Sequence, residues 1–189
     1  MVVTPSGASL RRAEAVERVR RTALDLMTAQ GFDSVTVEEI ARHAQVSPSS
    51  VYRYVGTKEA LVISTDRPST FAEQLRAAEA TSTPLAAFEQ AALDVWGTDD
   101  VAQEMRIVVA NPPLVHAFER QLLDQRDAVA EFFATRRGKA SPGLRDDALA
   151  AAALGVLAAM IIRWGRANGT PKALGKSLAK GLATISPPA

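Results

Sequence analysis

Apolar residues recur every three or four positions along most of the chain, which is the spacing of an amphipathic helix. Over residues 36–61 this spacing predicts two short helices joined by a tight turn and followed by the start of a third. The first of these helices has one apolar stripe, made of Val37, Ile40, Ala41 and Ala44. Beyond residue 61 helix follows helix, and no stretch shows the alternation typical of a strand. The pattern therefore predicts an all-α protein.

Helix-start signals indicate where the two short helices begin. Thr36 can cap the free amide groups of the first helix while Glu39 reaches back to the Thr36 amide, which makes a capping box. Ser47 can cap the second helix, and Pro48 falls at its first position, where the missing N–H costs nothing. Gln45 lies in the turn between them, so this turn either avoids a positive φ or carries mild strain.

The second of these helices presents two different faces. Val51 and Val55 lie one turn apart and are expected to point inward. The opposite face is small, polar and cationic, and consists of Ser49, Ser50, Tyr52 and Arg53. Such a face fits a DNA major groove without a clash, and its two longest side chains reach base edges or phosphates. This arrangement is typical of a helix-turn-helix.

Another helix is expected to start directly after this unit. Thr57 caps it and Lys58 lies in its first turn, where the cation and the free N–H groups suit a phosphate. We expect this helix to run to about Asp66, because Pro68 disfavours a helical Arg67 and breaks or kinks the helix.

Pro and Gly residues divide the rest of the chain into further helices, including a long one expected over residues 113–136 and a loop over residues 138–144. Residues 148–162 are apolar all round, yet they are too few for a membrane span, which needs roughly 20 residues. A helix without a polar face must be buried on several sides, and the same helix from a second copy would cover it. We therefore expect a homodimer through the helix at about 146–167, and no membrane partner.

Residues 36–61 also carry a family signature. The run T-x-x-x-I-A-x-x-A-x-V-S-x-x-x-x-Y-x-Y, followed by T-K-E-x-L, resembles that of TetR-type transcriptional regulators, and the match extends over residues 13–61. The resemblance implies a three-helix DNA-binding head followed by a helical bundle for dimerisation and ligand binding. It also implies that the last helix, at about 171–185, completes the dimer interface with the helix at about 146–167. We divide the chain accordingly into a disordered N-terminal arm at 1–12, a helix-turn-helix DNA-binding domain at 13–60 and a ligand-binding and dimerisation domain at 61–186.

The resemblance also implies which side chains contact DNA. Those near bases would be Pro48, Ser49, Tyr52 and Arg53. Those near phosphates would be Thr36, Ser50, Tyr54 and Lys58. Gln45 replaces a common turn glycine, Ser49 a frequent glycine or small residue and Val55 a frequent phenylalanine, but none of these departures removes a DNA contact. A two-fold dimer presents two reading helices roughly 34 Å apart, or a multiple of it, and so prefers a near-palindromic operator of double-stranded DNA.

Regulators of this type are mostly repressors that a small molecule releases from DNA, and the resemblance implies the same control here. The candidate lining residues in the body are Phe88, Trp96, Met105, His116, Phe118, Leu122, Met160 and Trp164. Polar anchors would be His116, Arg106, Asn111 and Arg163. Mostly apolar candidates indicate a hydrophobic or aromatic effector. The alternative for each residue is plain core, because aromatic and Met side chains at helical spacing usually pack inside a protein.

Composition narrows the class of protein. At 189 residues, of which 47% are hydrophobic, the chain is long enough for a sizeable core in one or two domains. Cys is absent and the two His residues stand in no metal-ligand or triad spacing, so we expect no enzyme, no metal and no cofactor. The first residues lack the apolar core of a signal peptide, which favours a cytoplasmic protein, associated with the nucleoid when bound to DNA.

The net charge of +1 is weak for a protein that binds nucleic acid by electrostatics alone, so binding must depend on local placement of cations. Arg11 and Arg12 either lie along a minor groove or form a solvated charged end. Two alternatives to an effector-controlled DNA reader stay open. In the first, the helix-turn-helix packs on a protein rather than on DNA. In the second, the dimer binds DNA but is not controlled by an effector.

Overall fold

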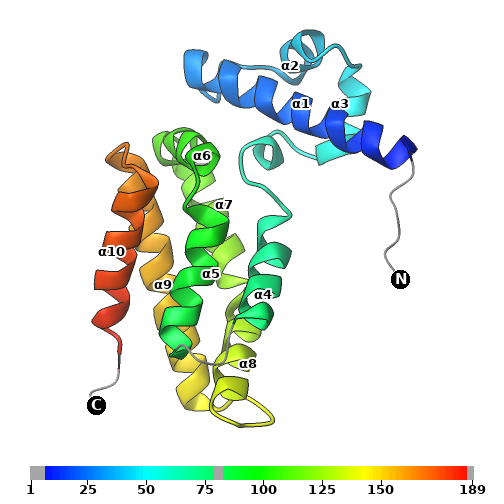
Figure 1. Ribbon diagram of the computed structural model, residues 1–189. Coiled ribbons are helices and arrows are strands. Elements are labelled where there is room, and N and C mark those ends of the chain that lie inside the picture. The colour runs from blue at the N-terminus through cyan, green and yellow to red at the C-terminus, as the bar shows by residue number, and fades with distance from the viewer. Residues whose placement is uncertain (1–6, 79–82, 187–189) are drawn as a thin grey trace. The chain divides into compact units, whose positions relative to one another are not determined.

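The computed structural model describes residues 7–78 and 83–186, and every regular element within them is a helix (Figure 1). The all-α prediction is therefore confirmed. The chain divides into two compact units, which we call the head, Met1–Ser64, and the body, Thr65–Ala189.

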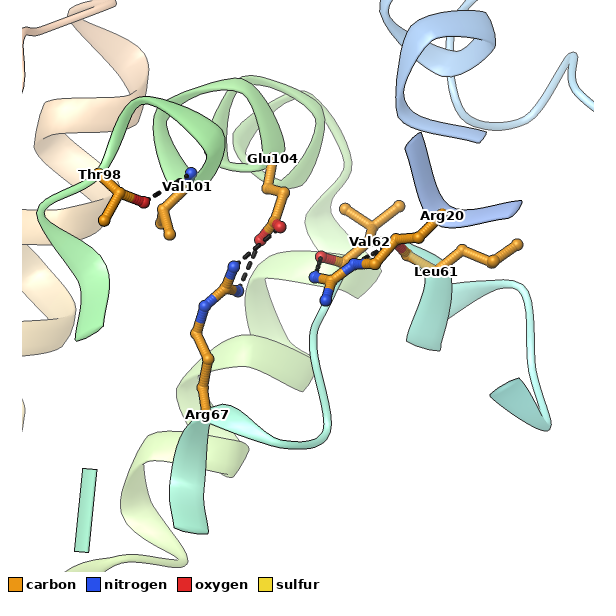
Figure 2. Close-up of polar contacts among 7 residues, drawn as sticks. All are labelled: Arg20, Leu61, Val62, Arg67, Thr98, Val101 and Glu104. Carbon is orange, nitrogen blue, oxygen red and sulfur yellow. Dashed lines mark hydrogen bonds and ion pairs between the residues drawn. The ribbon is translucent and has the colours of Figure 1, made fainter. Parts of the chain in front are cut away.

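Over residues 7–64 the head is built from three α-helices and one 3₁₀ turn: α1 (Gly7–Gln30), α2 (Val37–His43), α3 (Pro48–Val55) and η1 (Glu59–Leu61). Helix α1 packs against each of the other three elements. Its apolar stripe is buried through Val19, Ala23 and Met27. Long polar side chains of α1 hold the segments that follow: Arg18 Nε donates to the Ala44 carbonyl at 3.0 Å, and Arg20 Nε donates to the Leu61 carbonyl at 3.2 Å (Figure 2).

Two expectations for the head are wrong. Helix α1 already begins at Gly7, so residues 7–12 are helical rather than a disordered arm, whereas residues 1–6 lie outside the described residues. Residues 7–12 contain no Pro and include the good helix formers Ala, Leu and Arg. Arg11 and Arg12 consequently stand exposed on a helix, and an extended minor-groove arm is not formed at these positions.

The helix expected from Lys58 to Asp66 is replaced by the short turn η1. Leu61, Val62 and Ile63 are all buried, and a regular helix cannot turn three consecutive side chains to one side because successive residues point about 100° apart. The chain leaves the helical path to bury all three. The carbonyls of Leu61 and Val62, which a continuous helix would have paired with later amides, accept hydrogen bonds from the Arg20 guanidinium instead, the second at 3.4 Å (Figure 2).

The body is a bundle of seven helices within the described residues, and α9 and α10 lie side by side in it (Figure 1). In chain order they are α4 (Arg67–Ala77), α5 (Pro84–Trp96), α6 (Asp99–Ala110), α7 (Pro112–Leu123), α8 (Arg126–Arg136), α9 (Leu144–Arg166) and α10 (Pro171–Ala183). Helix α9 is central and packs on α6, α7, α8 and α10, whereas α4 packs on α5 and α8.

Pro and Gly boundaries in the body are mostly as expected, with two corrections. The single helix expected over residues 113–136 is two helices, α7 and α8, which separate at Asp124 and Gln125. Residues 124–127 are four consecutive polar residues with no apolar side chain to anchor a continuous helix. Pro68 does separate two elements, but Arg67 is itself helical, because proline is tolerated in the first turn of a helix.

Helix α9 is longer than its apolar segment suggested. With 23 residues and a mean hydropathy of 1.8 over its most apolar window, it is long and apolar enough to cross a membrane, while 44% of that window is buried inside the body. Its buried side chains, among them Leu154, Leu157 and Ile161, lie at the centre of the bundle. The core helix of a folded bundle shows the same composition, so this helix needs no bilayer to cover its inner face.

Candidate nucleic-acid interface

Short-range hydrogen bonds fix both helices of the helix-turn-helix. Thr36 Oγ1 accepts from the Glu39 amide at 3.1 Å, and Ser47 Oγ accepts from the Ser50 amide at 3.2 Å. Both caps are confirmed, and Pro48 occupies the first turn of α3. The reciprocal half of the capping box is different: the Glu39 carboxylate accepts from Gln30 Nε2 at 3.3 Å, because α1 ends close enough to supply a donor.

The turn between α2 and α3 carries the strain that Gln45 suggested. Gln45 has φ +56°, in the left-handed region that favours glycine. The Val46 amide donates to Ala41 O at 3.0 Å and the Gln45 amide to Arg42 O at 3.4 Å, which is the Schellman pattern of a helix end. The turn therefore needs the positive φ, and it adopts it without a glycine.

Helix α3 turns its polar face outward. Val51 is 1% exposed and Val55 is half-buried, whereas Tyr52 is 50% exposed. The rest of the exposed face consists of Ser47, Pro48, Ser49 and Arg53. Ser50 and Tyr54 are half-buried beside it. The valines point into the head and the residues expected near bases point out, as the sequence pattern predicted.

Side chains on this face are linked to one another. Ser47 Oγ lies 2.9 Å from Ser49 Oγ and 2.8 Å from Ser50 Oγ. Arg53 Nη2 donates to Ser50 Oγ at 3.1 Å, and the Arg53 guanidinium lies over the Tyr54 ring at 5.5 Å. These contacts hold the arginine against its own helix and leave the hydroxyl groups at the surface, where they can exchange partners with phosphate or base edges.

The remaining phosphate candidates are placed differently. Thr36 is exposed at the start of α2, as a backbone contact requires. Lys58 is half-buried with Nζ 4.4 Å from the centre of the Phe32 ring, a cation–π contact. It precedes a 3₁₀ turn of three residues, so the helix N-terminus expected to assist Lys58 with a phosphate is absent from this part of the described chain.

The effector candidates in the body differ in burial. Six of the eight are buried, and they are Phe88, Trp96, Met105, Phe118, Leu122 and Trp164. Met160 is half-buried and His116 is exposed. Of the other polar anchors, Asn111 Nδ2 donates to Ile107 O at 2.6 Å, while Arg106 and Arg163 are exposed. The structure therefore places the apolar candidates in the core and directs the polar ones elsewhere.

Two further aromatic side chains, which were not among the effector candidates, contact two of these residues in the core. Phe71 of α4 lies 4.9 Å from Trp96 and 5.5 Å from Phe88, centre to centre, and Phe133 of α8 lies 6.1 Å from Phe88. The sequence signal that could have identified this ring cluster is the presence of aromatic residues on the inward stripes of neighbouring helices. Their mutual contact depends on how α4, α5 and α8 pack, which the stripes alone do not specify.

Hollows in the surface of the body are lined by other residues. One of about 330 Å³ lies between α4 and α8, one of about 180 Å³ between α4 and α5, and one of about 190 Å³ between α5 and α10. None of the eight effector candidates lines these three hollows. Among the described residues, no group of three or more His, Cys, Asp or Glu side chains is placed to hold a metal ion.

Two ion pairs in the body, each with a buried carboxylate, were not foreseen from the sequence. Arg67 Nη2 donates to Glu104 Oε1 at 2.8 Å, and the two side chains are 16% and 5% exposed (Figure 2). Arg137 donates to both carboxylate oxygens of Asp146, at 2.9 and 2.6 Å, and this holds the pKa of Asp146 below its usual value of 3.8. The partners are 37 and 9 residues apart, distances at which sequence spacing gives no signal.

Comparison with known proteins covers both units. Residues 19–65 match the family of bacterial regulatory proteins described as the tetR family, and residues 84–188 match the MftR C-terminal domain. The chain is 30% identical to the HTH-type transcriptional regulator TcmR of Streptomyces glaucescens over 71% of its own length and 67% of the relative's. It is 27% identical to MftR of Mycobacterium tuberculosis, named for mycofactocin biosynthesis, over 82% of this chain and 81% of that one.

Solved structures share the fold. FadR of Thermus thermophilus, a transcriptional repressor solved in complex with lauroyl-CoA, has a TM-score of 0.60 with 22% identity, over 92% of this chain and 98% of that one. At this identity the likeness concerns the arrangement of helices and says nothing of which ligand the present body binds.

Proposed function

The chain belongs to the TetR family of transcriptional regulators, and from that premise we propose that it is a homodimeric repressor, released from a near-palindromic operator by a hydrophobic small molecule. The observation that carries the DNA-reading part is the outward face of α3, with Tyr52 50% exposed and Arg53 beside it while Val51 is buried. This proposal places the protein in the cytoplasm, and on the nucleoid when it is bound to DNA.

Dimerisation is supported by the outer face of α9. Small residues are exposed along one side of α9, at Ala148, Ala151, Gly155 and Ala159. A Cβ added at Gly155 would meet no atom within 4 Å, so this side of α9 is open to a close partner. Small residues allow two helices to approach closely, and a two-fold axis along this face would bring α9 and α10 of each copy into one interface. Such a dimer presents two copies of α3 to successive major grooves.

Effector control is supported by family membership and by the ligand named for the structural relative FadR, lauroyl-CoA, whose acyl chain is hydrophobic. A molecule that binds the body better in a form that does not fit the operator must weaken DNA binding by the same factor. The competing candidate is a regulator without an effector, favoured by the dense packing of six of the eight predicted lining residues. Fluorescence of the two tryptophans, both in the body, reports which of the two holds.

The experiment that tests the proposal is selection of bound duplexes from a random pool, followed by a salt titration on the recovered site. We expect a site with two-fold symmetry and an affinity that falls steeply as salt rises, because bound cations displace counterions from phosphates. A protein-binding module would enrich no duplex and would show no such slope. Recovery of an unsymmetrical site bound by one copy would contradict the dimeric form of the proposal.

A further inference from the structure

Arg53 is the cation on the outward face of α3, and two side chains of its own helix fix its position. Its Nη2 donates to Ser50 Oγ at 3.1 Å, and its guanidinium carbon lies over the Tyr54 ring, 5.5 Å from the ring centre. Ser50 is itself held by Ser47, whose Oγ lies 2.8 Å from Ser50 Oγ. Arg53 is exposed, whereas Ser50 and Tyr54 are half-buried. The exposed cation therefore rests on two side chains that the head partly covers.

Ser50 and Tyr54 are also the two residues of α3 that the family resemblance places near phosphates. In the structure the polar contacts of their side chains are with close neighbours. Ser50 Oγ contacts Ser47 and Arg53, and the Tyr54 ring contacts Arg53. The negative face of an aromatic ring attracts a cation without supplying a lone pair. Both residues are thus placed to orient Arg53, which is a different role from binding a phosphate.

These contacts leave most of the hydrogen-bond donors of Arg53 available. A guanidinium carries N–H groups on three nitrogens, arranged as a planar fork. One N–H group of Nη2 is used by Ser50, while Nε and Nη1 have no acceptor in the part of the chain that the structure describes. Parallel N–H groups at an edge of this fork match two acceptors that lie side by side. Arg53 can therefore bind such a pair and keep both of the contacts that hold it.

Of the four bases, guanine offers the matching pair. In the major groove it presents two acceptors, O6 and N7. Adenine presents one acceptor beside a donor, cytosine a donor, and thymine a single acceptor beside a methyl group. A phosphate also accepts from an arginine, but it attracts a mobile cation as well, whereas discrimination between bases requires a fixed orientation. The hold on Arg53 therefore favours a base edge over a phosphate.

We propose that Arg53 reads a guanine in each half-site of the operator, and that Ser50 and Tyr54 are positioning residues that act through it. This inference rests on the DNA reading proposed above and extends it by naming the base and the residues that orient its reader. Contacts that already hold Arg53 in the free protein reduce the freedom that its long side chain loses on binding. They strengthen the bond to the matching base and leave binding to other bases unchanged.

Arg53→Gln tests which base is read. Full-length wild-type and variant proteins each select duplexes from a random pool, and the base preferences are compared position by position. We expect the variant to lose a guanine at one position of each half-site and to prefer adenine there, because an amide pairs with N6 and N7 of adenine. Replacing this guanine by adenine should weaken wild-type binding by about 5- to 150-fold. The proposal is overturned if the variant keeps the wild-type preference at every position, or if the base it loses is not guanine.

Substitutions at the two positioning residues test how Arg53 is oriented, and the measured quantity is the ratio of affinities for the guanine and adenine sites. Tyr54→Phe keeps the ring and should keep this ratio, whereas Tyr54→Leu should lower it by about two- to fivefold. Ser50→Ala should lower it by about two- to tenfold, because Nη2 loses its acceptor. A ratio that survives both Tyr54→Leu and Ser50→Ala overturns the positioning role.

A second series separates the ring of Tyr54 from its hydroxyl without changing the shape of the side chain. Phenylalanine with one, two or three fluorine atoms at position 54 attracts a cation progressively less, so the affinity ratio should fall stepwise along the series. A hydroxyl that binds phosphate would behave differently. Tyr54→Phe would then weaken binding to both sites equally and the fluorinated series would show no trend, which would overturn the positioning role.

The body supplies a matched control pair. The Arg136 guanidinium lies over the Phe132 ring, 5.7 Å from its centre, so Phe132→Leu removes a ring from beside an arginine of the other unit. This variant should leave the affinity ratio unchanged. A wild-type protein that enriches no duplex contradicts the proposed function, whereas an enriched site whose preferences all survive Arg53→Gln contradicts this inference alone.

Discussion

The head and the body of this regulator are held in place by contacts of different range. On the outward face of α3 in the head, Ser47 caps the helix that carries Ser50 and Arg53, and the linking bonds span two or three residues. In the body, Arg67 reaches Glu104 over 37 residues, and rings from α4, α5 and α8 meet in one cluster. A surface fixed by local bonds is readable from a short stretch of sequence, whereas a site made by long-range packing exists only once the fold is complete.

The largest effect is expected from removing the long-range ion pair of the body, which tests whether long-range contacts stabilise this unit. Arg67→Ala leaves the Glu104 carboxylate, 5% exposed, without its guanidinium, and we expect the free energy of unfolding of the body to fall by about 3 kcal/mol. Urea unfolding followed by tryptophan fluorescence measures it, because both tryptophans lie in the body. The two tyrosines lie in the head, and their ring signals should change little at low urea.

Two controls accompany this variant. Arg126→Ala removes an exposed pair with Asp127, with side chains 60% and 87% exposed, and should cost no more than about 0.5 kcal/mol. The double variant Arg67→Met with Glu104→Met should recover most of the loss, because apolar side chains replace both charges. A loss at Arg67→Ala as small as that at Arg126→Ala would show that the buried pair does not hold the body.

Acid should weaken a second ion pair of the body. Asp146 is 1% exposed, and hydrogen bonds from Arg137, then from the Gly143 amide, hold its pKa below 3.8. A lowered carboxyl pKa means that the unfolded chain binds the proton more tightly, so this stabilisation is complete above pH 3.8 and is lost as pH falls toward the folded pKa. Asp146→Asn should lower stability at neutral pH, and its difference from wild type should shrink as the pH falls below about 4. A difference that stays constant across this range would contradict the assignment.

Features that depend on local bonds could be predicted from the sequence, whereas most features that depend on long-range packing could not. The caps at Thr36 and Ser47 and the inward Val51 were predicted because each depends on residues one turn apart. The turn η1 was not predicted, since it depends on which side chains the finished core accepts, and the break between α7 and α8 was missed although residues 124–127 are all polar. The partner of Arg67 and the ring neighbours of Trp96 are set by helix packing, for which a single sequence carries no spacing rule.

A smaller effect is expected in the head from losing one local bond. Ser47→Ala removes the cap of α3 and should cost about 1 kcal/mol of head stability. It also removes the hydroxyl that contacts Ser49 and Ser50, so operator affinity should fall with it. Tyrosine ring signals during urea unfolding measure the first effect and titration with the operator the second. Unchanged values of both would mean that α3 is ordered by long-range packing, as the body is.

The smallest expected effect is a gain of stability at the turn. Gln45→Gly relieves the positive φ of +56° and should stabilise the head by about 0.5–1 kcal/mol, after allowing for the greater freedom of glycine in the unfolded chain. Asn168 has φ +47° at the end of α9 and serves as the matched control in the body. Because asparagine tolerates this region better, Asn168→Gly should gain less. An equal or larger gain at Asn168 would contradict strain at Gln45.

The central claim is that the outward face of α3 reads DNA, and a footprint of the selected operator by a doubly substituted protein tests it most directly. Tyr52→Ala with Arg53→Ala removes the two longest side chains of this face, one of them 50% exposed, without touching the buried Val51. We expect protection of the operator to disappear, because each of the two truncations should weaken operator binding by about 1–3 kcal/mol. The dimer mass and the unfolding midpoint should stay at their wild-type values. If the variant protects the same site at the same concentration, α3 does not read the bases.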